Sequence, residues 1–299
     1  MTTLRILALR HTRLFFKDKG MFFTALITPM ILFVLYATFL GNVFRDAFLS
    51  GIPEGILLPE GLVDGFVGGQ LMSSILAVSC VTVAFCSNLL VVQDKANGAI
   101  HDLTVSPVSP KTLALSYYIS TFVTTLIICF AAALLSFIYV GFIGWYFSAS
   151  DVLFLLLDIV LGALFGTAFS SVVNFFLSSQ GQMSAVGSIV SSCYGFICGA
   201  YMPISQFSTG LQRVISFLPG TYLTSLFRNH ALGGVFREME RLHLPTECIE
   251  GVKKSIDATI CFFDIEVPTT AMFLIVLGVS LLLIGAYIAL HARKYKGKQ

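Results

Sequence analysis

Long apolar stretches, separated by short polar segments, dominate this sequence. Crossing a hydrocarbon core of about 30 Å takes ~20 apolar residues in a helix. Runs of this kind occupy residues 21–44, 66–92, 112–140, 152–177, 183–202 and 268–290. Within lipid, a backbone without water satisfies its own polar groups by forming helices. The pattern therefore predicts an all-α integral membrane protein with six transmembrane helices.

The first apolar run follows basic residues, as the core of a cleaved signal peptide does. At residues 21–44 it is longer than such a core, and no small-x-small cleavage site comes after it. We therefore interpret it as the first span. Residues 1–20 before it predict either a basic helix lying on the cytoplasmic membrane surface or only a positively charged topology signal.

Composition supports the membrane class. Hydrophobic residues make up 56% of the 299 positions and charged residues 11%, with a mean hydropathy of +0.88. Soluble domains carry about 25% charged residues. The net charge of +2, with no basic tract interleaved with aromatic residues, argues against nucleic-acid binding.

The distribution of Lys and Arg predicts the orientation in the cell membrane. Residues 1–20 carry five of them and the tail 291–299 carries four, whereas 41–65 has one Arg against four acidic residues. Cytoplasmic segments are enriched in Lys and Arg. We therefore expect both termini and residues 93–111 in the cytoplasm, residues 203–267 outside, and a single transmembrane domain over 21–290.

Motifs of enzymes are absent from the sequence. It contains no G-x-x-x-x-G-K-[ST], no H-E-x-x-H and no G-x-S-x-G. The histidines all fall in predicted loops or tails, at His11, His101, His230, His243 and His291. We therefore predict no catalytic residue, no metal site and no cofactor in this chain.

Two spans carry small residues at every fourth position. Such rows let helices approach closely in lipid, so we interpret them as packing seams within the bundle or between two copies. The rows are Gly162, Gly166, Ser170 and Asn174 in the fourth span, and Gly187, Ser191, Gly195 and Gly199 in the fifth.

Asp158 precedes the fourth-span row by one step and lies inside the apolar run. An ionisable residue there is costly and is a functional-site hypothesis by default. With Asn174 it is the candidate for a substrate path. A hydrogen-bonded acid that only pins neighbouring helices is the alternative. Asp158 also leaves open an ion-coupled secondary transporter, although no repeated halves are visible.

The external segment 203–267 is not uniformly polar. Apolar stretches too short to span lie on either side of Pro219 and Gly220, which together break a helix. We expect two half-helices that dip into the outer leaflet, followed by a small cap. Cys248 and Cys261 both fall in this region, either as a disulfide or as two free thiols.

The order of these elements resembles the type 2 permeases of ATP-binding-cassette (ABC) exporters, most closely the branch typified by daunorubicin permeases. The family's second cytoplasmic segment has an acid, a glycine and a Pro-Val-Ser turn, matched by Asp94, Gly98 and Pro107-Val108-Ser109. Its outer motifs are matched by Gly199 with Pro203, and by Pro219 with Tyr222. The resemblance covers nearly the whole chain through individually loose motifs.

The resemblance implies a division of labour. Such permeases pair with a second permease copy or a paralogue, and a separate ATPase subunit binds ATP and Mg²⁺. The short cytoplasmic helix in residues 94–106 would dock on that ATPase. The lipid-embedded chain would then form the path of a lipophilic or amphipathic substrate. The residues implied in coupling are Asp94, Lys95, Asn97, Gly98, His101, Asp102 and Pro107. Where the family commonly has Glu after the glycine, this chain has His101 and Asp102.

Overall fold

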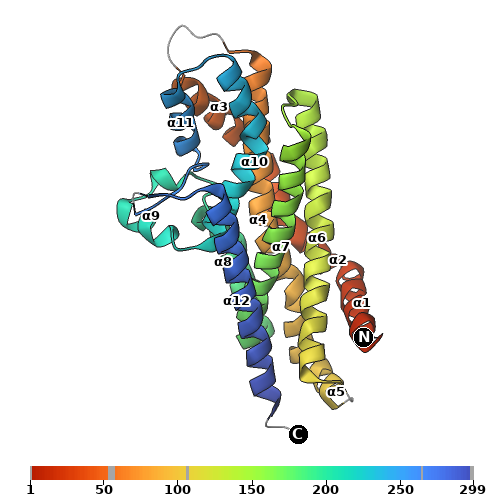
Figure 1. The fold of residues 1–299 in the computed structure, drawn as a ribbon. Coiled ribbons are helices and arrows are strands. Elements are labelled where there is room, and N and C mark those ends of the chain that lie inside the picture. The colour runs from red at the N-terminus through yellow and green to blue at the C-terminus, as the bar shows by residue number, and fades with distance from the viewer. Residues whose placement is uncertain (1, 53–57, 106–107, 264, 297–299) are drawn as a thin grey trace.

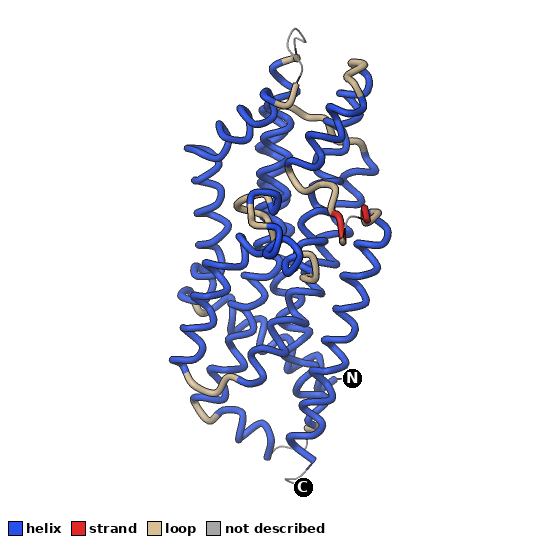
Figure 2. The backbone as a smooth tube through the Cα atoms, turned by 90° about the vertical axis from the view of Figure 1, so that its left-hand side faces the viewer, coloured by secondary structure: helices blue, strands red, loops and turns tan. Residues whose placement is uncertain are grey.

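The computed structural model describes residues 2–52, 58–105, 108–263 and 265–296. This part of the chain is almost entirely helical, with long helices side by side along one axis (Figures 1 and 2). The all-α prediction is confirmed. The helices are α1 (Thr2–Lys17), α2 (Lys19–Leu35), a π-helical turn η1 (Tyr36–Leu40), α3 (Gly41–Ser50), α4 (Glu60–Ala96), α5 (Ala99–Val105), α6 (Pro110–Ile143), α7 (Ala149–Phe176), α8 (Gln180–Ile197), a 3₁₀ turn η2 (Ile204–Gln206), α9 (Thr209–Ile215), α10 (Pro219–Arg241), α11 (Thr246–Ser255) and α12 (Thr269–Lys296).

All six predicted spans form helices, but they are not equally apolar. Among the described residues, five helical runs are long and apolar enough to cross a membrane: Lys19–Ser50, Gly61–Ala96, Pro110–Ile143, Ala149–Phe176 and Thr269–Arg293. The predicted fifth span is α8, whose 18 residues extend about 27 Å. Its glutamines and serines leave it less apolar than the other five, so its assignment as a span remains a prediction.

The first span is one run of helix interrupted by a π turn. Asp18 begins it, because its carboxylate accepts a hydrogen bond from the backbone N–H of Met21 at 3.1 Å. The run passes through α2, η1 and α3 without leaving helical geometry. A π turn inserts one extra residue into the helix and shifts the face that follows. The buried face of α3 accordingly presents Phe44 and Phe48 to α4.

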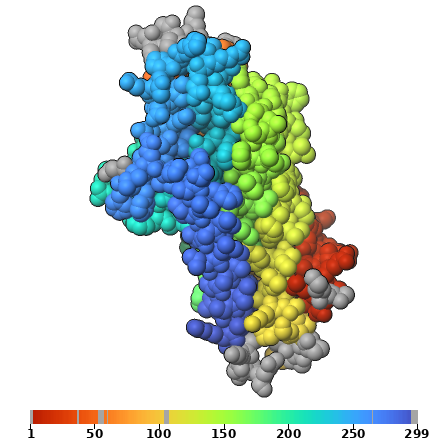
Figure 3. Space-filling view, viewed as in Figure 1, coloured from red at the N-terminus to blue at the C-terminus, as the bar shows by residue number. Residues whose placement is uncertain are grey.

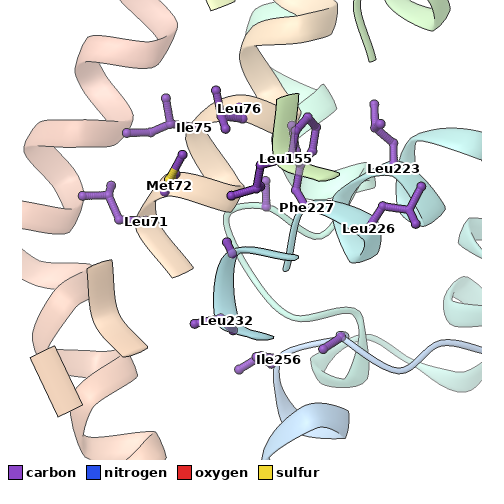
Figure 4. Packing of buried hydrophobic residues seen from close by; sticks show 14 of the residues in the cluster. Leu71, Met72, Ile75, Leu76, Leu155, Leu223, Leu226, Phe227, Leu232 and Ile256 are labelled. Atoms are coloured by element: carbon purple, nitrogen blue, oxygen red, sulfur yellow. The ribbon is translucent and has the colours of Figure 1, made fainter. Parts of the chain in front are cut away.

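Helix α4 is the centre of the bundle. The most apolar stretch of 18 residues in α4 is 94% buried, whereas the corresponding stretch of α12 is 17% buried. Its neighbours include α2, α6, α7, α8 and α10. Figure 4 shows Leu71, Met72, Ile75 and Leu76 of α4 in the same cluster as side chains of α7 and α10. A helix surrounded by others needs apolar or small residues all round, and α4 has them.

Residues 203–267, which the sequence predicts to lie outside, differ from the two expected half-helices. The first arm is short, since α9 has seven residues. The second arm, α10, has 23 residues and packs against α4, α7 and α12 along much of its length. Pro219 is the first residue of α10 and does not break it, because a proline at that position loses no helical hydrogen bond. The cap is α11 with a two-stranded hairpin, β1 (Cys261–Phe262) and β2 (Ile265–Glu266).

The two ends of the bundle differ in what they carry. Helices α3 and α11 and the end of α10 lie at one end, whereas α5 and the end of α12 lie at the other (Figure 1). Helix α1 packs against the side of α6 in the half nearer to α5 (Figure 3). Helix α1, helix α5 and the C-terminal end of α12 therefore lie in the same half of the molecule (Figure 1).

Candidate functional site

The turn between α4 and α5 is built around Gly98. Its φ of +79° lies in the left-handed region that glycine enters without strain. Among the described residues, no heavy atom lies within 4 Å of where a Cβ would be, so the turn requires glycine for its backbone and not for a close approach. Asn97, His101 and Asp102 are exposed around it. Pro107 lies outside the described residues.

Asp94, the first of the implied coupling residues, is directed into the protein. Its Oδ2 accepts a hydrogen bond from the Tyr117 hydroxyl of α6 at 2.5 Å and lies 3.6 Å from Nη1 of Arg10 on α1. The residue is 7% exposed. The carboxylate therefore joins α4 to α6 and α1, and a contact of Asp94 with a partner protein remains a prediction.

Lys95 is also held within the chain. Its ammonium donates to three backbone carbonyls at the end of α7, those of Asn174, Phe175 and Leu177, at 2.8–2.9 Å. The last carbonyls of a helix have no helical partner, and a cation placed there satisfies them and the helix dipole. Lys95 thus ties the end of α4 to the end of α7, and its expected role as a partner contact remains a prediction.

Helix α1 docks through a histidine that the sequence placed in a tail. The imidazole of His11 is fully buried and stacks on the Tyr117 ring with centroids 3.9 Å apart. Burial, with the adjacent Arg10 guanidinium, lowers the pKa of His11 to about 3. Thr12 and Ser120 add a hydroxyl contact at 3.0 Å. Tyr117 therefore touches both α1 and Asp94.

The fourth-span row of small residues lies between α7 and α4. A Cβ on Gly166 would come 2.1 Å from the carbonyl oxygen of Cys80, and one on Gly162 would come 2.8 Å from the Cys80 sulfur. One turn further, Ser170 accepts a hydrogen bond from Asn88 of α4 at 3.2 Å. These glycines permit a backbone approach that any side chain would block, as expected for a seam within the bundle.

Asn174 continues this row towards Lys95. It is fully buried, and among the described residues neither atom of its side-chain amide has a hydrogen-bond partner. Unpaired buried amides are uncommon and call for an explanation. Its carbonyl is one of the three that Lys95 binds. A role in a substrate path remains a prediction for Asn174.

The row in α8 divides into two parts. Gly187 is partly exposed, and no atom of the described residues lies within 4 Å of where its Cβ would be; Ser191 is also partly exposed. Gly195, in contrast, lies directly under the Tyr201 ring, and Gly199 ends the helix with a φ of +78°. The first half of the row is therefore open on this chain, while the second half shapes the turn after α8.

That turn is fixed by a buried arginine. Arg228 of α10 donates to the Gly199 carbonyl at 2.5 Å and pairs with Asp257 at 3.2 Å. Asp257 also accepts from the Ile204 N–H at 2.7 Å, just after Pro203. A buried charge is tolerated when it is paired and hydrogen-bonded. Nothing in the sequence pattern distinguished Arg228 from the basic residues of a solvated cap.

The other outer residues shape the start of α10. A Cβ on Gly220 would come 2.7 Å from the Tyr194 hydroxyl of α8, and Tyr222 donates to the Ser216 carbonyl at 2.6 Å. Cys248 and Cys261 are both free thiols here, with the Cys248 Sγ 3.2 Å from the Gly51 carbonyl oxygen. Of the two alternatives, the structure contains the unpaired one.

Asp158 meets a partner that sequence reasoning missed. Its Oδ2 lies 2.5 Å from Nδ1 of His230 on α10, and the carboxylate is 1% exposed. His230 was placed in an external loop, because α10 was expected to be short. No spacing signal links positions 158 and 230, since the pair is made by packing of α7 on α10.

Across the described residues, no group of three His, Cys, Asp or Glu side chains could hold a metal ion. The site is instead a set of helix-to-helix contacts. At one end lies the exposed α4–α5 turn, whose neighbours Asp94 and Lys95 bind α6 and α7. In the bundle lies the Asp158–His230 pair. Such an arrangement suits movement of helices against one another.

Comparison with known proteins agrees with this architecture. No curated protein matches the chain. A family model described as ABC-2 family transporter protein matches residues 56–290, from the start of α4 through most of α12. The matched part contains the α4–α5 turn, the α4–α7 seam and the outer region. The chain is therefore a multi-pass membrane transport protein that belongs to the ABC-2 transporter family.

Proposed function

We propose that this chain is the permease subunit of an ATP-driven exporter in the cell membrane, powered by a separate ABC ATPase. The observation that carries the proposal is the division within the α4–α5 segment. Asn97, Gly98, His101 and Asp102 are exposed in or beside a sharp turn, while the adjacent Lys95 is anchored in the bundle.

This division suits a coupling element. A partner can grip only what is exposed, and motion reaches the membrane only through residues that are fixed to other helices. Lys95 connects the turn to α7, and Asp94 connects it to α6 and α1. A push on the turn would thus be passed to three helices. The absence of a P-loop motif from the sequence fits an ATPase on another chain.

The proposed orientation places both termini in the cytoplasm. The Lys and Arg distribution supports it, and α1, α5 and the end of α12 lie toward the same end of the molecule (Figure 1). A second copy or a paralogue would pack on this chain, and the open half of the α8 row at Gly187 and Ser191 is a suitable surface. The resemblance to drug-exporter permeases favours a lipophilic or amphipathic cargo.

Asp158 supports a second candidate function. A titratable pair among packed helices, Asp158 with His230, is what an ion-coupled secondary transporter uses. Transport that stops on ATP depletion with the ion gradient clamped supports the exporter. Transport that continues without ATP and stops with an uncoupler supports the secondary transporter.

Coupling is tested by co-expressing the chain with a candidate ABC ATPase from the same organism. We expect Asp102→Lys, on α5 beside the exposed turn, to lower co-purification of the ATPase several-fold. The matched control is Glu250→Lys, an equal charge change at an exposed acid of the outer cap, which should leave the complex intact. Equal recovery of the ATPase with both variants would remove the α4–α5 turn as its docking site.

A further inference from the structure

A pocket of about 550 Å³ opens between α7, α10 and α12. This volume is in the range of sites for drug-sized molecules. Thr269 and Thr270, the first residues of α12, lie at its rim, so the pocket sits at the outer end of that span. Its walls are mainly apolar and come from Phe154, Leu157, Leu226, Phe273 and Leu274.

The pocket opens toward the side of the bundle. Leu274 is 65% exposed and Leu157 is 45% exposed, although both line it. In a membrane-spanning helix, such side chains face lipid or another subunit and not water. A ligand would therefore enter from the bilayer without passing through the core that surrounds α4. Its tail would lie against the apolar walls of the pocket.

Among the polar groups that line the pocket is a carboxylate with one unused oxygen. Asp158 lines the pocket and its Oδ2 is held by His230. Its Oδ1 is buried, and among the described residues it has no hydrogen-bond partner. A carboxylate has about four acceptor positions, and leaving an oxygen unsatisfied in apolar surroundings is costly. A donor supplied by a ligand would remove this cost.

Charge selects the kind of donor. An ammonium group on Oδ1 would stabilise the ionised form of Asp158, and no Lys or Arg is among the described residues that line the pocket. An anionic headgroup would be repelled there. An alcohol could donate one hydrogen bond but would leave the charge uncompensated. An ammonium group supplies both the donors and the charge, and the rings of Phe154 and Phe273 also favour a cation.

We propose that this lateral pocket binds a lipophilic primary amine from the outer leaflet, with its ammonium group on Asp158 and its tail along α12. The shared chemistry is an ammonium group on an apolar body, carried either by a free amphiphile or by an aminophospholipid. The claim that this pocket belongs to the path of the cargo rests on the proposed export function. The binding itself requires neither ATP nor the ATPase.

The test is binding of radiolabelled dodecylamine to the chain in nanodiscs of phosphatidylcholine, with the signal of empty nanodiscs subtracted. We expect Asp158→Asn to weaken binding at least tenfold, because Asn keeps the shape and loses the charge. Asp151→Asn is the matched control, an equal change on the same helix at an acid paired with Arg237 and outside the pocket, and should bind as the wild type does. Dodecanol, which has the same tail without the charge, should bind weakly to all three.

Leu274→Trp supports the test if Asp158→Asn folds poorly. It replaces an exposed side chain at the pocket mouth, and should also weaken dodecylamine binding without touching the carboxylate. Adding phosphatidylethanolamine to the nanodiscs identifies the source of the amine. If that lipid competes with dodecylamine, the pocket binds an aminophospholipid. If that lipid does not compete, the pocket binds a free amphiphile.

Unchanged dodecylamine affinity in a folded Asp158→Asn variant would overturn the inference, as would equal affinity for dodecanol; if Asp158→Asn does not fold, unchanged affinity in Leu274→Trp would overturn it. Different results would contradict the proposed export function. Binding that depends on Asp158 without any ATP-driven transport would remove the exporter and keep the pocket. ATP-driven transport with an unchanged affinity in Asp158→Asn would remove the pocket and keep the exporter.

Discussion

The Nζ atom of Lys95 lies 2.8 Å from the carbonyl oxygen of Phe175, so that the last turn of α4 caps the last turn of α7. The same ammonium binds the carbonyls of Asn174 and Leu177. One side chain thereby fixes the relative position of two helix ends. It stands three residues before Gly98, where the exposed turn begins.

Lys95→Met should detach α4 from the end of α7. Hydrogen bonds to a charged group contribute about 1.5–3 kcal/mol, so the thermal unfolding midpoint of the purified protein should fall measurably. Lys95→Arg keeps the charge and the donors and should restore most of the loss. A Met variant as stable as the wild type would show that this cap does not hold the two helices.

Gly166→Ala should separate α4 from α7. The added Cβ would come 2.1 Å from the Cys80 carbonyl, a backbone atom that cannot move aside without moving α4. Overpacking of this kind costs about 1–3 kcal/mol. The matched control is Gly278→Ala on α12, where no atom of the described residues lies within 4 Å of the new Cβ. Equal yields and unfolding midpoints for both variants would contradict the seam.

Acidification should weaken the docking of α1 through His11. The pKa of His11 is lowered to about 3 in the folded protein from an ordinary 6.5, so the neutral form is favoured on folding. The contribution is present above pH 6.5 and is lost as the pH falls from 6.5 toward 3. At pH 5 the loss is about 2 kcal/mol, from 1.36 kcal/mol for each pH unit.

The measurement is hydrogen exchange in residues 2–17 at pH 7.5 and pH 5, corrected for the intrinsic effect of pH. The groups facing His11 are Arg10 on its own helix and Tyr117 on α6, with Asp94 of α4 binding both. His11→Phe keeps the stacking on Tyr117 and cannot take up a proton. If its α1 loses protection in acid as much as the wild type does, His11 is not the group responsible.

Labelling tests the orientation of the chain. In a background without the exposed native thiols Cys193 and Cys261, cysteines at Lys111 and Arg293 should react with a membrane-impermeant maleimide only after the cells are opened. A cysteine at Glu250 should react in intact cells. Reaction of Glu250→Cys only in opened cells would place the cap on the cytoplasmic side of the membrane, which would contradict the proposed orientation.

Much of the fold was predictable, because the length and apolarity of a span are local properties. The six helices lie close to their predicted bounds, but the predicted helix over 94–106 is divided, because α4 ends at Ala96 and α5 begins at Ala99. The length of α10 was not predictable in the same way. Arg228 and His230 have the sequence character of solvated residues, and in the bundle they are paired with Asp257 and Asp158.

The coupling segment shows the same limit at single residues. Asp94, Lys95 and Asp102 are equally polar in sequence, but the first two are used within the chain and the third is exposed. Which carboxylate or ammonium is used internally depends on the neighbours that α6 and α7 bring. Those neighbours are distant in sequence, so no local pattern separates the two groups.

The most direct measurement of the coupling proposal is photo-crosslinking from Asn97. A photoreactive amino acid at this exposed position, in membranes that also contain the candidate ABC ATPase, should form a crosslink to that ATPase. The same amino acid at Glu250, exposed on the outer cap, should form none. A crosslink from Asn97 alone is the predicted result. No ATPase crosslink from Asn97, or an equal one from Glu250, would contradict the account.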